Sequence, residues 1–382
     1  MALKLGDVSL GRENNIDFWR LCLATAVIWS HSYPLLFGNN DREPFLLATG
    51  GQRTCGDLAV DGFFILSGFL IARSWTSSRG LGDYLRRRAF RIYPGFLMAV
   101  AVSGLIAGPL LHRSPAAYWK NFPWRAFLIG GANLSFVEPI KSVSINASLW
   151  SIRYEFLCYL AVAGLGLCGI LSRRRFVAFA FLACMSVYAG QIYFNLRLPG
   201  SRLSWLYCSP DSWPRLMSDF LAGVLFYCYR DRIVLSWPLV IGTVMGLLAV
   251  GVVAPSLQAL PLAVPVLGGY VLFFASYLPM GRLQHVARRG DLSYGLYLYA
   301  YPIQLLLVKA FQPWLNPLSL FLIALAVTAV FAAASWRFVE SPFLRLKRSS
   351  RPSQDRPELA IEPPHAPAPA EPLTPTAPSE EV

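Results

Sequence analysis

The chain has 382 residues, of which 55% are hydrophobic and only 14% are charged. A soluble domain carries about 25% charged residues, so the composition excludes an ordinary soluble protein and indicates a membrane protein. The net charge of +13 would suit a nucleic-acid partner. However, the arginines cluster at the ends of apolar segments, as in "LRRRAFR" and "SRRRF", which is typical of cytoplasmic loops. We therefore expect contact with membrane lipids and no nucleic acid.

The spacing of apolar segments and basic loops predicts an all-α bundle of about ten transmembrane helices with both termini in the cytoplasm. The predicted spans are Ile16–Phe37, Leu58–Trp75, Ile92–Leu111, Ser148–Leu171, Phe176–Asn195, Arg215–Tyr229, Ile233–Val253, Leu257–Leu278, Leu292–Phe311 and Leu318–Phe338. A short apolar piece, Ala126–Val137, is expected to dip into the membrane without crossing it. Residues 1–15 form a polar cytoplasmic N-terminus, 16–343 the membrane domain, and 344–382 a Pro-rich cytoplasmic tail that we expect to be disordered.

The first predicted span carries polar residues that a membrane helix rarely tolerates. Arg20 and His31 are eleven residues apart, which places them on one helix face, ~16 Å apart along the axis. Of the four histidines, only His31 lies within a predicted span. Ionisable groups inside a bilayer are costly and usually functional. A packing role for a single membrane histidine is the alternative.

Two carboxylates are predicted at a depth similar to that of His31. Asp61 lies near the outer end of the second span, and Glu155 lies about two turns into the fourth. A carboxylate bonded to an imidazole raises its basicity, and such a pair can take a proton from a hydroxyl. For Glu155 and the nearby Arg153, a structural ion pair between helices is the alternative.

Three arginines are predicted at the cytoplasmic side, opposite His31. Arg20 lies about one turn into the first span, and Arg88 and Arg91 share a helix face because they are three residues apart. The guanidinium fork suits phosphate recognition. A ligand with a charged cytoplasmic end and a long thin arm, such as a coenzyme A thioester, would span the gap to His31. No pattern of histidines and cysteines suggests a metal.

Six stretches, in the right order, make the chain resemble the acyltransferase 3 family of integral-membrane acyltransferases. They are "IDFWRLCLATAVIWSHS", "VDGFFILSGFLIARS", "RRRAFRIYP", "NASLWSIRYEFLCYL", "DLSYGLYLYAYPIQ" and "RFVESPF". The resemblance covers about residues 15–343. One departure is clear: many relatives carry a histidine in the late motif, where this chain has Ala300 between two tyrosines.

The resemblance implies a multi-pass protein of the bacterial inner membrane that transfers an acyl group. The donor is most often cytoplasmic acetyl-CoA. The acceptor is a hydroxyl of an extracytoplasmic carbohydrate, such as an exopolysaccharide or lipopolysaccharide glycan. It implies a catalytic role for His31 with Asp61 and Glu155 in support. Arg20, Arg88 and Arg91 would bind the donor. Ser67 and Gly68 would let the thioester arm approach a helix backbone, although packing is an equal alternative for this small pair.

Several points stay open at the level of sequence. His31 would act as a general base or pass through an acyl-imidazole. A proton-coupled transporter or flippase of a glycan or lipid-linked intermediate, and an inactive scaffold of a polysaccharide-export complex, are the alternative functions. Assembly as a homo-oligomer or within a polysaccharide-assembly complex is open, as is a disulfide between Cys55 and Cys208.

Overall fold

The computed structural model describes residues 3–9, 14–139, 144–200, 208–278, 281 and 290–349. Within these residues the protein is all-helical, except for an isolated bridge between Lys4 and Val234. Residues 344–349 belong to a helix, so the helical domain continues past the boundary predicted at 343. The rest of the predicted tail, 350–382, lies outside the described residues, as does part of the predicted N-terminal segment.

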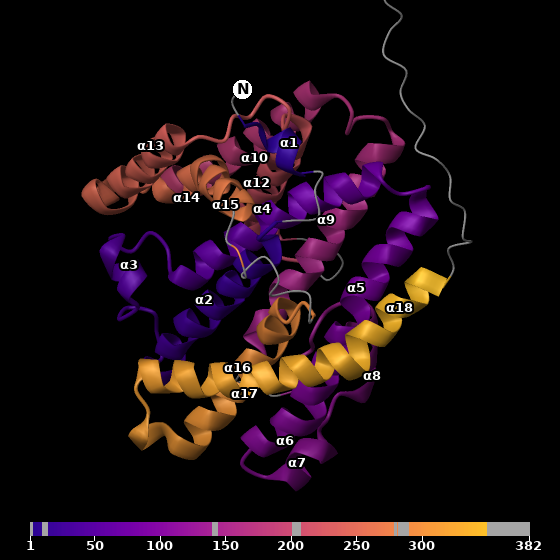
Figure 1. Cartoon of the computed structure of the whole chain (residues 1–382). Helices are drawn as coiled ribbons and strands as arrows, with labels where there is room; N and C mark the ends of the chain where they lie inside the picture. The colour runs from indigo at the N-terminus through magenta and orange to yellow at the C-terminus, as the bar shows by residue number, and fades with distance from the viewer. Residues whose placement is uncertain are drawn as a thin grey trace, which may run out of the picture.

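Helical segments coincide with each of the predicted spans, often with shifted ends (Figure 1). In chain order the long segments are α2 (Ile16–Phe37), α4 (Cys55–Thr76), α5 (Leu81–Ala101) continued by η1 (Val102–Ala107) and α6 (Gly108–Leu111), α9 (Trp150–Leu167), α10 (Arg174–Phe194), α12 (Trp213–Cys228), α13 (Trp237–Leu248) with η4 (Ala249–Val253), α14 (Leu260–Ala263) with η6 (Val264–Gly268) and α15 (Gly269–Tyr277), α16 (Ser293–Phe311), and α17 (Pro317–Ser335) with η9 (Trp336–Glu340) and α18 (Ser341–Ser349).

Short helices connect these segments. They are α1 (Leu5–Ser9), α3 (Pro44–Ala48), α7 (Pro115–Lys120), α8 (Trp124–Ala132), η2 (Ala147–Leu149), η3 (Pro210–Ser212), η5 (Pro255–Leu257) and η8 (Gln312–Trp314). The predicted dipping segment corresponds to α8, which has nine residues and is too short to cross a bilayer. The largest shift is at α5, because the "RRR" sequence predicted as a loop is the first part of this helix.

Among the described residues, five helical segments are long and apolar enough to cross a membrane: 55–76, 81–111, 174–194, 260–277 and 317–345. By length and composition, these segments indicate a polytopic membrane protein. The helix α2, which carries Asp17, Arg20 and His31, is 22 residues long and is not among the five. Apolar side chains on several helices point outward, and in the segment 317–345 only 28% of the most apolar window is buried. Such a surface suits lipid.

Local sequence signals set the ends of the two helices that carry most of the site. Gly38, with φ 81°, closes α2 in the left-handed conformation that glycine adopts without steric cost. A capping box opens α4: the Thr54 hydroxyl accepts from the Asp57 amide, and the Asp57 carboxylate accepts from the Thr54 amide. Asp57 is therefore held in a defined position at the start of α4.

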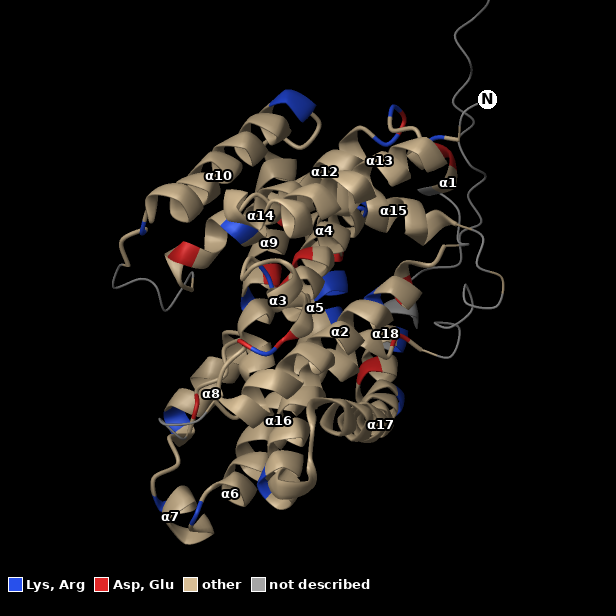
Figure 2. Cartoon of the chain, turned by 90° about the vertical axis from the view of Figure 1, so that its left-hand side faces the viewer, with Lys and Arg blue, Asp and Glu red and all other residues tan. Residues whose placement is uncertain are grey.

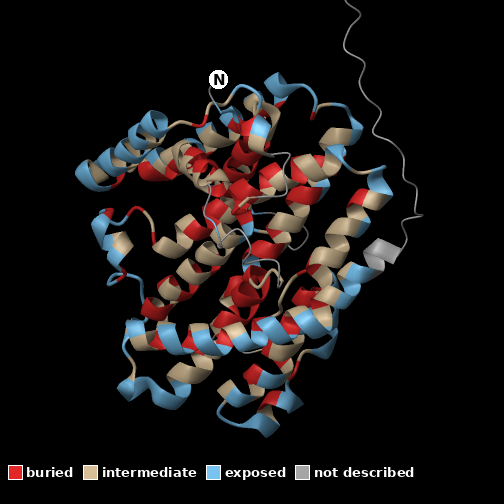
Figure 3. Cartoon of the chain, in the orientation of Figure 1, coloured by how far each residue is buried: buried red, intermediate tan, exposed pale blue. Residues whose placement is uncertain are grey.

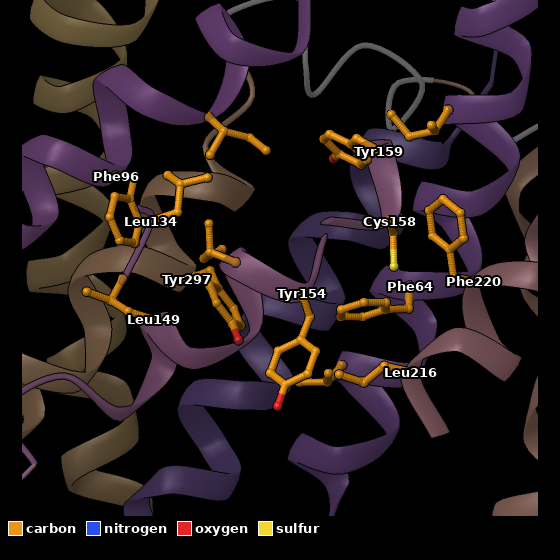
Figure 4. Packing of buried hydrophobic residues seen from close by; sticks show 14 of the residues in the cluster. Phe64, Phe96, Leu134, Leu149, Tyr154, Cys158, Tyr159, Leu216, Phe220 and Tyr297 are labelled. Atoms are coloured by element: carbon orange, nitrogen blue, oxygen red, sulfur yellow. The ribbon is translucent and has the colours of Figure 1, made fainter. Parts of the chain in front are cut away.

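The buried residues concentrate in the middle of the bundle, where α2, α4, α9, α12 and α16 meet, whereas α13 and α17 expose much of their surface (Figure 3). Within the largest buried cluster, aromatic rings from α4, α9 and α16 lie among aliphatic side chains (Figure 4). Charged residues also reach this interior (Figure 2). The seven cysteines are free, so the disulfide considered between Cys55 and Cys208 is not formed.

Candidate functional site

Arg20 and Arg91 meet at one carboxylate, Asp291, just before α16. Arg20 lies 3.8 Å from it and Arg91 forms a close ion pair with it. Arg91 also lies 3.8 Å from Glu340 of η9. Burial would raise the pKa of Asp291, but the Arg91 and Arg20 charges and hydrogen bonds from Ser293 outweigh it and hold that pKa well below its usual range. The structure thus brings two of the three predicted donor-binding arginines together.

The third arginine, Arg88, lies one turn earlier on α5 and faces Tyr159 and Glu155 of α9. Its Nε atom is buried without a hydrogen-bond partner in the described part of the chain, and so is the Nε atom of Arg20. Unused buried donors of this kind are costly unless something binds them. Both arginines therefore keep donor capacity for an anionic ligand.

Glu155 is fixed by two hydroxyl groups. Ser67 of α4 donates to its carboxylate at 2.5 Å, and Tyr159 donates from the next turn of α9 at 2.6 Å. The predicted site residue Ser67 therefore contacts Glu155 directly. Gly68 instead packs against α12, where a Cβ atom would come within 1.9 Å of the Phe220 carbonyl oxygen, so the structure gives it the packing role.

A narrow cavity connects these groups. It has a volume of about 30 Å³, roughly that of one water molecule, and Arg20, Glu155, Ser293 and Tyr294 line it together with Phe63 and Tyr297. His31 is not among its lining residues. Phe63 packs edge-on against Tyr297, with ring centroids 5.8 Å apart, and also against the cluster that contains Ala24 and Ile28. Within the described part of the chain, the cavity that Arg20 lines therefore does not reach His31.

His31 lies six residues before Phe37, the last residue of α2. The Tyr301 ring, from the residue after Ala300, approaches its imidazole edge-on at 5.1 Å between centroids. The Nδ1 atom of His31 is buried and has no hydrogen-bond partner among the described residues. A buried imidazole nitrogen that is left unpaired is available to bind or to move a proton.

Asp57, rather than the predicted Asp61, is the carboxylate whose charge acts on His31. The helices bring the two residues together because Gly56 packs directly on Ser30: a Cβ atom at Gly56 would lie 2.9 Å from the Ser30 side chain. His31 directly follows Ser30 in the sequence, and Asp57 directly follows Gly56, so this contact holds His31 and Asp57 near each other. The Asp57 side chain is 35% exposed, so its charge is partly solvated.

Asp61 is committed to a different partner. Its carboxylate accepts from the Arg215 Nε atom at 2.7 Å, and the same guanidinium group donates to Asp57 at 3.0 Å. Asp219, one turn after Arg215 on α12, is buried against Asp61. The expected hydrogen bond between Asp61 and His31 is therefore replaced by a buried ion network, because Asp61 lies on the face of α4 that packs against α12.

Sequence reasoning missed Asp57, Arg215, Asp219 and Asp291. A signal was present for two of them. Arg215 and Asp219 are four residues apart in an otherwise apolar helix, a spacing that places opposite charges on one face. Nothing in the sequence marks Asp291 as the partner of arginines in α2 and α5.

Together, the site offers guanidinium groups for an anion at one end of α2 and an unpaired imidazole at the other. Comparison with known proteins gives the family of the chain. A family model described as an acyltransferase domain matches residues 13–337. The chain belongs to the acyltransferase 3 family.

The family includes relatives of similar length. An O-acetyl transferase of Shigella phage Sf6 is 27% identical over 344 residues, which cover 87% of this chain and 96% of the relative. Nodulation protein 10 of Rhizobium leguminosarum bv. viciae is 27% identical over 377 residues, covering 89% and 96%. Acyltransferase MdmB of Streptomyces mycarofaciens is 30% identical over 109 residues, 28% of this chain and 27% of that protein. No solved structure matches the chain.

Proposed function

We propose that the protein is an O-acyltransferase of the bacterial inner membrane, with both termini in the cytoplasm, that moves an acetyl group from cytoplasmic acetyl-CoA to a hydroxyl of an extracytoplasmic carbohydrate. The observation that carries this proposal is the pairing on α2 of a histidine, whose Nδ1 atom is buried without a hydrogen-bond partner among the described residues, with an arginine eleven residues earlier. The family match over residues 13–337 supports it.

The arginine cluster fits the charged end of the donor. Arg20 and Arg88 have buried Nε donors without partners among the described residues, and guanidinium groups recognise phosphate oxygens through such donors. Asp291 and Glu340 offset the charge of Arg91 in the absence of a ligand. Binding of a phosphate group therefore competes with these carboxylates for the arginines.

His31 supplies the proton transfer. The acceptor hydroxyl gives its proton to the imidazole while its oxygen attacks the thioester carbonyl carbon. A carbon–oxygen bond forms, the carbon–sulfur bond breaks, and the departing thiolate takes up a proton. Asp57 stabilises the imidazolium electrostatically, since its charge is the one that acts on His31. The Tyr301 ring restricts the orientation of the imidazole.

The test is His31→Ala in membranes supplied with radiolabelled acetyl-CoA and the host's surface glycan. We expect transfer to fall by about 10²–10⁴-fold, the range for loss of a general acid–base group. His112→Ala is the matched control, since His112 lies between α6 and α7 and bonds its own loop. Transfer by His31→Ala at the wild-type rate refutes the assignment. Absence of label on any acceptor with the wild-type protein favours the transporter alternative.

A further inference from the structure

A second cavity lies on the other side of the first turns of α9. It has a volume of about 400 Å³ and mixed polar and apolar walls, formed by the segment after α8, by η2 with the start of α9, and by the residues around η3. The mechanism above uses none of its lining residues. We propose that this cavity binds a sugar ring of the acceptor glycan, an inference that rests on the proposed function.

Asn146 provides an unused hydrogen-bond acceptor in this cavity. Its side-chain amide donates to the Ser103 hydroxyl and to the Leu298 carbonyl, both at 2.9 Å. Both amide hydrogens are thus engaged and the side chain cannot turn. Its Oδ1 atom is buried without a partner among the described residues, and the residue is only 2% exposed. A sugar hydroxyl is the kind of donor that would satisfy this oxygen.

Trp150 provides an apolar platform in the same wall. This first residue of α9 is 44% exposed, and its indole lies edge-on to Tyr154 with ring centroids 5.6 Å apart. Tyr154 is held in turn by its hydroxyl bond to the Ser209 carbonyl at 3.0 Å and by the Trp213 ring at 5.0 Å. A rigid, half-exposed indole can cover the apolar C–H face of a pyranose ring.

The charges in the cavity favour a neutral or acidic sugar over a basic one. Arg153 lines the cavity. Glu138, the one carboxylate among its described lining residues, accepts from the Ser144 hydroxyl at 2.6 Å and from the Ile145 amide at 2.8 Å. Burial raises the pKa of Glu138, although these hydrogen bonds lower it in part. Glu138 thus mainly holds the segment that contains Ser144 and Ile145 in place and adds little attraction for cations.

The helix α16 connects the wall of this cavity to the surroundings of His31. Its Asn146 side chain is bonded to Leu298, and Tyr301, whose ring contacts His31, is three residues further along the same helix. Three residues advance a helix by ~4.5 Å and return nearly to the same face. A sugar held on Asn146 and Trp150 would therefore lie within about one helical turn of the ring that touches the imidazole.

Saturation-transfer difference NMR on the full-length protein in detergent tests the inference without acyl-CoA. The probes are the methyl glycosides of glucose, galactose, rhamnose and glucuronic acid. We expect signals for at least one of them, and a roughly threefold to tenfold weaker affinity in Trp150→Ala. Trp119→Ala is the control, because Trp119 is 38% exposed but stacks on Trp124 in a different region. Asn146→Ala should weaken the same signals, with thermal unfolding used to verify its fold.

The outcomes separate the two proposals. The cavity assignment is overturned when no glycoside binds, or when binding is equal in the wild type and Trp150→Ala. Where acyl transfer is measurable, Trp150→Ala should raise the KM for the glycan with little change in kcat, which a general loss of folding would not do. Sugar binding without any acyl transfer would instead refute the proposed enzyme and leave the sugar site standing.

Discussion

Arg215 shows how a single side chain organises the polar interior. Its guanidinium group holds Asp61 at 2.7 Å and Asp57 at 3.0 Å, and also donates to the Asp57 carbonyl at 2.9 Å. Asp219 is buried beside Asp61. Three carboxylates thus gather around this arginine, whose side chain is 15% exposed, and Arg53 adds a second positive charge near them. Because Arg215 also fixes Asp57, it positions the charge that faces His31.

Replacing Arg215 should therefore destabilise the fold. Arg215→Met removes the charge and leaves buried carboxylates unpaired, a change that costs about 3–5 kcal/mol for a buried pair. Arg215→Lys keeps the charge but loses the two-pronged geometry, so we expect an intermediate loss. Thermal unfolding of the detergent-solubilised variants measures both. Equal melting temperatures for Arg215→Met and the wild type would show that the network contributes nothing to stability.

The helices α4 and α12 make a close backbone contact, and two glycines permit it. A Cβ atom at Gly68 would lie 1.9 Å from the Phe220 carbonyl oxygen, and one at Gly223 would lie 2.0 Å from the Ile65 carbonyl oxygen. Each glycine faces the backbone of the partner helix. In membranes, where burial of apolar surface does not drive helix association, such small-residue contacts stabilise helix pairs.

Gly223→Ala should consequently separate these helices. Forcing a methyl group against a backbone carbonyl costs at least about 1–3 kcal/mol, the range for overpacked interiors. Gly164→Ala in α9 is the matched control, since nothing lies within 4 Å of a Cβ atom there, and it should be neutral or stabilising by up to about 1 kcal/mol. Chemical denaturation followed by tryptophan fluorescence compares the two. A Gly223→Ala variant as stable as Gly164→Ala contradicts the described crossing.

The same helix pair shows what a sequence can and cannot predict. Apolar run length located the helices, and the family motifs placed Arg20, Arg91 and Glu155 in the polar interior. Depth in the membrane placed Asp61 near His31, but depth does not define the direction in which a side chain points. That direction depends on how α4 rotates against its neighbours, and the rotation is set by long-range contacts such as those of Gly56 with Ser30 and of Gly68 with α12.

At the scale of the whole molecule, the two ends of the site are separated. The cavity at Arg20 has a volume of about 30 Å³, whereas pockets for drug-sized ligands measure about 300–1,000 Å³. The thioester arm of the donor therefore requires an opening between α2, α4 and α16. Phe63 links the cavity wall to the packed cluster that contains Ile28, because it contacts Tyr297 and packs against this cluster.

Shortening Phe63 should open this path and uncouple the reaction from its acceptor. In Phe63→Ala, water gains access to the thioester near His31, so release of free coenzyme A thiol without any glycan should rise about tenfold, equivalent to about 1.4 kcal/mol of barrier. A thiol-reactive dye follows this release. Phe273→Ala is the control, since it removes the same ring from a fully buried position in a separate cluster, where Phe273 packs against Phe69. If folded Phe63→Ala protein releases thiol no faster than Phe273→Ala, Phe63 does not close the passage. The loss of a phenyl ring would then have the same effect at either position.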